Sequence, residues 1–164
     1  MQLEQNTKEV DCLEILEAYS AKGIFSGLKS EASGSDLRFR FRWHMKRMYE
    51  LRISRDFSKC QLLGILPSVP KQSALDKNFR EFTHQYFRDH QKRQQTGDPN
   101  LLKAIVRNRN GSVSVQVFCA ARNVDVMIPE LINFLHQTYA YFLRIGGYDE
   151  YLVEAFGVDL DSYM

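Results

Sequence analysis

Apolar and cationic residues alternate along residues 37–43, which read Leu-Arg-Phe-Arg-Phe-Arg-Trp. In a β-strand, side chains at every second position share one face of the sheet. The apolar residues of this segment therefore share one face, and Arg38, Arg40 and Arg42 share the other. The pattern predicts a strand over residues 37–44, in a sheet with one dry face and one basic, solvated face.

Two further strands are expected after this one. Residues 49–55 alternate in the same way, with Tyr49, Leu51 and Ile53 on the dry face. Residues 59–66 are apolar on both faces, which is typical of a central or doubly covered strand, and Pro67 ends it. Residues 30–35 are rich in small polar residues and are predicted to form a loop.

Apolar residues at spacings of three and four predict helices over residues 7–22, over residues 73–95 and from Pro129 to about residue 146. The apolar stripe of the first helix is expected to consist of Val10, Leu13, Leu16 and Tyr19. Asn6 is the expected N-cap of the first helix. Ser73 is the expected N-cap of the second, with Asp76 three positions later. A short helix over residues 149–156 and an acidic tail follow.

A β-hairpin is predicted around Asn110-Gly111, the preferred pair for a two-residue type I′ turn. Counting back from this turn pairs Arg109 with Ser112 and Leu102 with Cys119. This register places the valines of the hairpin on the dry face. It places Lys103 and Arg107 on the opposite face, together with the apolar exceptions Ile105 and Phe118.

The predicted fold class is α+β, with the order α-β-β-β-α-β-β-α. Every pair of consecutive strands has a short connection, which favours an antiparallel five-stranded sheet with the helices packed on one face. Residues 1–164 are expected to form a single domain, with a core over 7–145 and a short helix and acidic tail over 146–164.

This element order resembles the type III secretion chaperone fold and the related bacterial YbjN-like domains. The likeness lies in the opening helix, in the three-strand meander ending at Gly64-Ile65-Leu66-Pro67, and in the hairpin followed by the helix Pro129–Leu143. The resemblance implies a homodimer without catalysis that binds a protein partner. Secretion chaperones tend to be acidic, whereas the middle of this chain is basic, which favours a YbjN-like binding protein.

Composition fits an ordinary globular protein, with 44% hydrophobic and 26% charged residues. Three cysteines, an odd number spread over the chain, predict free thiols in a reducing compartment. The first ten residues are polar, and no apolar run reaches the roughly 20 residues that span a bilayer. We therefore expect a cytoplasmic protein that does not insert into membranes.

The formal net charge of +2 conceals a strong asymmetry along the chain. Residues 36–109 carry 17 Lys or Arg against 7 Asp or Glu, whereas residues 1–35 carry 3 against 6 and residues 110–164 carry 2 against 7. Two interpretations are open. The acidic ends can pair with the basic middle, within the chain or across a dimer, or the middle can present a basic surface to an anionic partner.

Six basic residues are predicted to share the solvated face of the sheet and to bind the partner. They are Arg38, Arg40, Arg42, Arg52, Lys103 and Arg107. Cations side by side on a sheet repel unless negative groups meet them, and those groups can be internal carboxylates, an acidic polypeptide or nucleic acid. A sheet that reads nucleic acid normally adds exposed aromatic residues for stacking, but the aromatic residues of the 37–43 strand point to the dry face.

No catalytic, phosphate-binding or metal motif stands out, so no enzyme activity, cofactor or metal is expected. The four histidines lack the spacing of metal ligands, and Cys119 falls among valines. The sequence thus favours a non-enzymatic protein-binding module, chaperone-like or regulatory and homodimeric. The alternative is a nucleic-acid-binding domain that uses the basic sheet face.

Overall fold

The computed structural model describes residues 2–92 and 101–159, and it shows one six-stranded antiparallel sheet. The strands follow the order β1-β2-β3-β4-β6-β5 across the sheet. Their bounds are β1 Ser26–Ser33, β2 Asp36–Trp43, β3 Arg47–Ser54, β4 Lys59–Leu66, β5 Leu102–Arg109 and β6 Ser112–Cys119.

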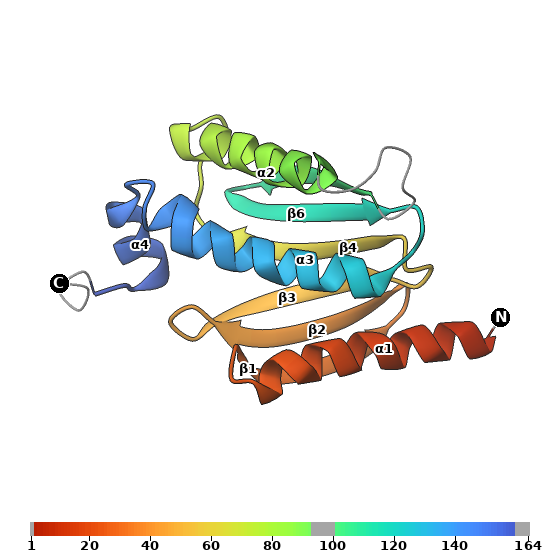
Figure 1. The fold of residues 1–164 in the computed structure, drawn as a ribbon. Helices are drawn as coiled ribbons and strands as arrows, with labels where there is room; N and C mark the ends of the chain where they lie inside the picture. The colour runs from red at the N-terminus through yellow and green to blue at the C-terminus, as the bar shows by residue number, and fades with distance from the viewer. Residues whose placement is uncertain (1, 93–100, 160–164) are drawn as a thin grey trace.

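Three long helices lie on one face of this sheet (Figure 1). They are α1 Gln2–Ala21, α2 Ala74–Lys92 and α3 Val124–Gln137. The chain of α3 continues as a π-helix, η1 Thr138–Leu143, and a short helix, α4 Asp149–Phe156, follows. Burial alternates along the strands, as in β6, because only the face beneath the helices is dry. The predicted α+β class, antiparallel sheet and one-sided helix layer are confirmed.

The expected number of five strands is wrong, because an additional strand, β1, forms over residues 26–33 and includes part of the segment 30–35 that was predicted to be a loop. Its residues Ser-Gly-Leu-Lys-Ser-Glu-Ala-Ser carry little β-propensity and no run of alternating apolar side chains. A bulge next to Gly27, at a φ of +66°, interrupts its pairing with β2. An edge strand that buries few side chains does not need alternating apolar residues, so the sequence shows little sign of this strand.

The other strand predictions agree closely with the structure. β4 has the predicted bounds and lies in the centre of the sheet, between β3 and β6. The hairpin has the predicted register, since Arg109 pairs with Ser112 and Leu102 pairs with Cys119. Strands β2 and β3 begin one and two residues earlier than expected.

The helix boundaries differ more from the predictions. Helix α1 begins at Gln2, so Asn6 lies inside it and is not its N-cap. Helix α3 begins at Val124 rather than Pro129, because the side chain of Asn123 caps it by accepting a hydrogen bond from the backbone N–H of Asp125. The predicted start of α2 is confirmed in its capping, since the Asp76 N–H donates to Ser73 Oγ over 3.2 Å. The predicted end of this helix at residue 95 lies outside the described residues.

The core lies between the sheet and the helices. Cys12 and Leu16 of α1 are fully buried, whereas Val10, which the apolar spacing placed on the buried stripe, is 53% exposed. Phe79 of α2 and Phe134 of α3 are fully buried and contact each other. The helix layer thus covers one face of the sheet and leaves the polar face of β2 and β3 uncovered by any described helix.

Candidate basic sheet face

The uncovered face of β2 and β3 brings together four of the six predicted partner-binding residues. Arg38, Arg40 and Arg42 alternate along β2 with the buried side chains of the dry face. Arg52 of β3 lies directly opposite Arg38. The long hairpin that joins these strands therefore collects four guanidinium groups on one side of the sheet.

Glu50 neutralises part of this cluster. It lies opposite Arg40, and its carboxylate accepts hydrogen bonds from Arg40 Nε at 3.0 Å and from Arg52 Nε at 2.7 Å. Burial alone would raise the pKa of Glu50, but the hydrogen bonds and charges of these two arginines outweigh burial and hold it below its usual value. The interpretation that internal carboxylates meet the arginines therefore holds for Arg40 and Arg52.

Arg38 and Arg42 differ, because neither forms an ion pair within the described residues. Arg42 is exposed and lies opposite Met48 on β3. Arg38 is half-buried, and its buried Nε has no hydrogen-bond partner in the described part of the chain. A buried donor without an acceptor is unfavourable, and the charge of Arg38 is not matched by an ion pair in the described part of the chain.

Lys103 and Arg107, the other two predicted residues, share this face but lie apart from the β2–β3 cluster. Both are exposed on β5, at the far edge of the sheet. Gln61 and Gln116 of the intervening strands β4 and β6 are paired with each other, and Arg107 Nε donates to Gln116 Oε1 over 3.4 Å. The predicted set therefore forms two groups, which the strands β4 and β6 separate.

Other residues of the same face were missed in the sequence, although the strand registers place them there. Basic members outnumber the acidic ones on this face. Beyond the predicted set, the charged residues of this face are Lys29, Glu31, Asp36, Glu50, Lys59 and Arg109. The pairing partner of Arg40 could have been found by aligning the alternation of residues 49–55 with that of 37–43.

The acidic ends of the chain form no ion pair with the arginines of β2 within the described residues, although Glu31 of β1 lies opposite Arg38. One ion pair joins an end to the middle, between Glu9 Oε1 and Arg55 at 2.9 Å, and it lies at the turn between β3 and β4. Asp149, Glu150 and Glu154 of α4 are exposed. The charge asymmetry seen in the sequence is therefore a spatial asymmetry as well.

A second concave site lies on the dry side, between the end of β2, α1 and α3. It is a pocket of about 400 Å³ walled by Trp43, Ile132 and His136. Next to it, His44 stacks on Trp43 and Tyr139 at ring-centroid distances of 4.2 and 4.4 Å. Burial, with a smaller effect of His136 and Arg47, lowers the pKa of His44 to about 3, so the imidazole is neutral at physiological pH.

This pocket carries no recognisable catalytic arrangement. His44 Nδ1 lies 3.1 Å from the hydroxyl of Tyr49, whose own pKa burial raises, and no described carboxylate orients the imidazole. A general base that works at neutral pH needs a pKa near 7, which is well above the pKa of His44.

The three thiols lie in the core rather than at an accessible site. Cys12, Cys60 and Cys119 come from α1, β4 and β6 and are each at most 1% exposed. Burial, with the nearby charge of Asp11, raises the pKa of Cys12 to about 12, and burial likewise raises that of Cys60. Thiols in this environment are poor nucleophiles, as expected for Cys119 among valines.

Within residues 2–92 and 101–159, no group of three His, Cys, Asp or Glu side chains is placed to hold a metal ion.

Compared with known proteins, the chain matches no protein family, no curated protein and no solved structure. No helix in the described part of the chain combines the length and the apolar character that crossing a bilayer requires.

Proposed function

We propose that this protein is a non-enzymatic binding module, chaperone-like or regulatory, that holds an acidic polypeptide segment on the uncovered face of β2 and β3. The observation that carries the proposal is that Arg38 and Arg42 form no ion pair among the described residues and lie on a face that no described helix covers (Figure 1). Glu31 of β1 lies opposite Arg38 without forming an ion pair with it. Cations arranged in this way repel one another until an anionic group is added.

The geometry favours an extended ligand. Arg38 and Arg42 are four residues apart on one strand, so about 13 Å separates their backbone positions. An extended peptide with acidic residues at every second position presents its carboxylates on one side at the same repeat. Such a peptide can place carboxylates over both arginines without any change in the sheet.

The proposal is tested with a fluorescein-labelled peptide of alternating Glu and Ala and a control peptide with Gln in place of Glu. The acidic peptide should bind, and binding should weaken as NaCl rises from about 50 to about 300 mM, because salt screens exposed charges. The variant Arg38→Glu with Arg42→Glu should lose about 2 kcal/mol of binding free energy, which is about a thirtyfold rise in Kd. The reason is that each ion pair between an arginine and a peptide carboxylate becomes a repulsion between two carboxylates.

A matched control reverses two exposed cations of α2, Lys77→Glu with Arg88→Glu, which changes the net charge equally on the helix side. The proposal is wrong if this control weakens peptide binding as much as the β2 variant does, because the effect would then follow net charge rather than the site.

Nucleic acid is the second candidate, and one observation favours it. Phe118 lies on the uncovered face between Lys59 and Lys103, which are its direct cross-strand neighbours. An aromatic ring flanked by cations can stack on a base. A single-stranded RNA oligonucleotide should then bind more tightly than the acidic peptide, and Phe118→Ala should weaken it. Equal binding of RNA by wild type and Phe118→Ala would remove this candidate.

A further inference from the structure

The outer edge of β1 is unpaired. Strand β1 lies at one end of the sheet order and pairs only with β2, and no other described strand contacts its outer side. An eight-residue edge strand presents free N–H and C=O groups to any chain that can add a strand.

The hairpin between β1 and β2 determines which of these groups point outward. Ser33 pairs with Asp36 across a two-residue turn, so these two residues form a hydrogen-bonded pair, and such pairs alternate along the strands. Lys29 and Glu31 therefore bond to β2, whereas the backbone N–H and C=O of Ser30 point away from the sheet. Ser30 is thus a free hydrogen-bonding position near the centre of the edge.

The charges beside Ser30 are self-complementary. In an antiparallel pair of two β1 strands centred on Ser30, Lys29 lies opposite the partner subunit's Glu31, and the reverse contact forms by symmetry. Both side chains lie on the uncovered face, because their partners on β2 are Arg40 and Arg38. Centring the pair on Lys29 or on Glu31 would instead place like charges face to face, which is unfavourable. We propose that two copies of this chain dimerise by antiparallel pairing of their β1 edges, centred on Ser30.

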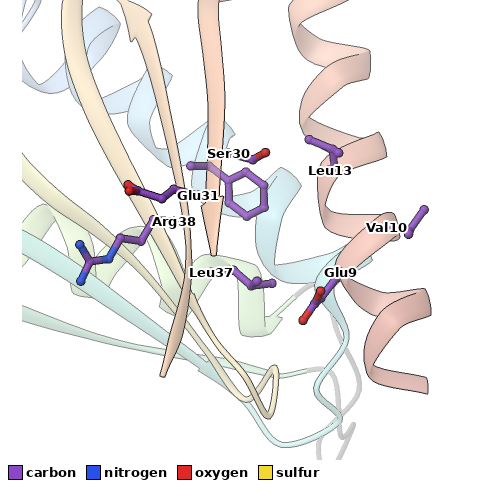
Figure 2. Close-up of a pocket in the computed structure, with 8 residues that line it drawn as sticks. Glu9, Val10, Leu13, Ser30, Glu31, Leu37 and Arg38 are labelled. Atoms are coloured by element: carbon purple, nitrogen blue, oxygen red, sulfur yellow. The ribbon is translucent and has the colours of Figure 1, made fainter. Parts of the chain in front are cut away.

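A groove at this edge supports the pairing. Figure 2 shows Val10 and Leu13 of α1 on one side of it, with Ser30 and Leu37 on the other. The groove has a volume of about 340 Å³, and its apolar lining residues are Val10, Leu13, Leu37 and Phe39. Val10 is 53% exposed in the single chain. A strand added at β1 runs along the mouth of this groove and reduces the exposure of Val10.

The dimer has a consequence for the basic face. Pairing through β1 makes one continuous sheet in which the β2–β3 arginines of both copies share one face, on the two sides of the twofold axis. A longer acidic segment can then bridge the two sets. The dimer does not itself require the acidic ligand, so dimerisation and peptide binding can fail separately.

Sedimentation equilibrium on the full chain tests the dimer. The wild type should show twice the 19.2 kDa mass of one chain at about 100 µM. Lys29→Glu and Glu31→Lys should each raise the dimer dissociation constant at least about tenfold, because each places like charges opposite one another at two symmetric positions. An equimolar mixture of the two variants should dimerise again, since both cross-strand pairs are then of opposite charge.

A backbone test uses Ser30→Pro, which removes an outward N–H without breaking a bond to β2. It should abolish the dimer, whereas Ala104→Pro, at an equivalent outward position on the opposite edge strand β5, should leave it intact. A monomeric wild type, a dimer that survives Ser30→Pro, or a mixture of charge variants that stays monomeric would each overturn the proposal. Circular dichroism of every variant verifies that it is folded.

Discussion

Glu50 gives the sharpest test of how charge is distributed on the basic face, because its removal should change stability and binding in opposite directions. The substitution Glu50→Gln leaves the shape of the side chain nearly unchanged and removes its charge. It deprives Arg40 and Arg52 of their common carboxylate partner.

The expected loss of stability follows from the exposure of the two ion pairs. The side chain of Glu50 is 16% exposed, but those of Arg40 and Arg52 are 50% and 32% exposed, so solvent screens both pairs. Pairs of this kind contribute about 0.2–1 kcal/mol each, which gives an expected loss of about 1 kcal/mol in the free energy of unfolding. Urea unfolding followed by the fluorescence of Trp43, the only tryptophan, measures this loss.

The expected gain in affinity for the acidic peptide arises because Glu50 no longer offsets the positive charge of Arg40 and Arg52. Removing one negative charge about 7 Å from a bound carboxylate, in a water-like dielectric, is worth about 0.6 kcal/mol, or about threefold in Kd. Fluorescence anisotropy with the alternating Glu peptide measures it. Asp36→Asn serves as the control, because it removes a charge on the same face that forms no ion pair among the described residues.

The reasoning would be refuted if Glu50→Gln weakened peptide binding. That result would mean that Glu50 positions the arginines for the ligand rather than competing with it. An unchanged stability would show that the two hydrogen bonds contribute nothing in solution.

Three further predictions concern the core. Burial keeps His44 neutral in the folded protein, so the unfolded chain binds a proton first as pH falls below about 6.5. The free energy of unfolding of the wild type should therefore fall by up to about 1.4 kcal/mol per pH unit towards pH 3. The variant His44→Asn keeps a residue that suits the φ of +49°, and its free energy of unfolding should depend less on pH than that of the wild type in urea titrations from pH 7 to 4.5. The same pH dependence in both proteins would contradict a buried neutral imidazole. Cys60 should react with a thiol reagent at least about a hundredfold more slowly in the native protein than in urea, and labelling at equal rates would contradict its burial. Asn108→Ala should lower the free energy of unfolding by about 2–3 kcal/mol, because Asn108 Nδ2 donates to the buried Asp76 carboxylate at 3.2 Å. Gln85→Ala on the exposed face of α2 should lower it by less than about 1 kcal/mol. Equal losses in these two variants would show that the buried amide has no special role.

Period-two alternation was sufficient to predict the strands that bury one face. Residues 37–43 and 102–119 place apolar side chains at every second position, and the structure buries them as the pattern requires. The basic face follows from the same alternation, since the arginines occupy the remaining positions of β2. The opposition of Arg40 and Glu50 depends on the register between two strands, which a three-residue turn determines. Neither strand displays this register alone, and it emerges only when the two alternating patterns are aligned.

The features missed by the sequence analysis are those that local signals do not specify. Strand β1 is stabilised by the neighbouring strand rather than by its own residues, so its weak propensity concealed it. Asn123 is an ordinary N-cap residue, but Pro129 provided a more conspicuous start signal five residues inside the true helix. The exposed Val10 shows that apolar spacing identifies a stripe without showing how much of it the fold covers.

The most direct test of the account is to map the acidic peptide onto the sheet by nuclear magnetic resonance, following backbone amide and arginine Nε–H signals of the ¹⁵N-labelled protein. The account predicts that the signals that shift belong to the uncovered face of β2 and β3, with the Nε–H signals of Arg38 and Arg42 changing most. Shifts confined to α2 and α3, or to the pocket beside Trp43, would contradict it and would place the binding site on the helix side of the sheet.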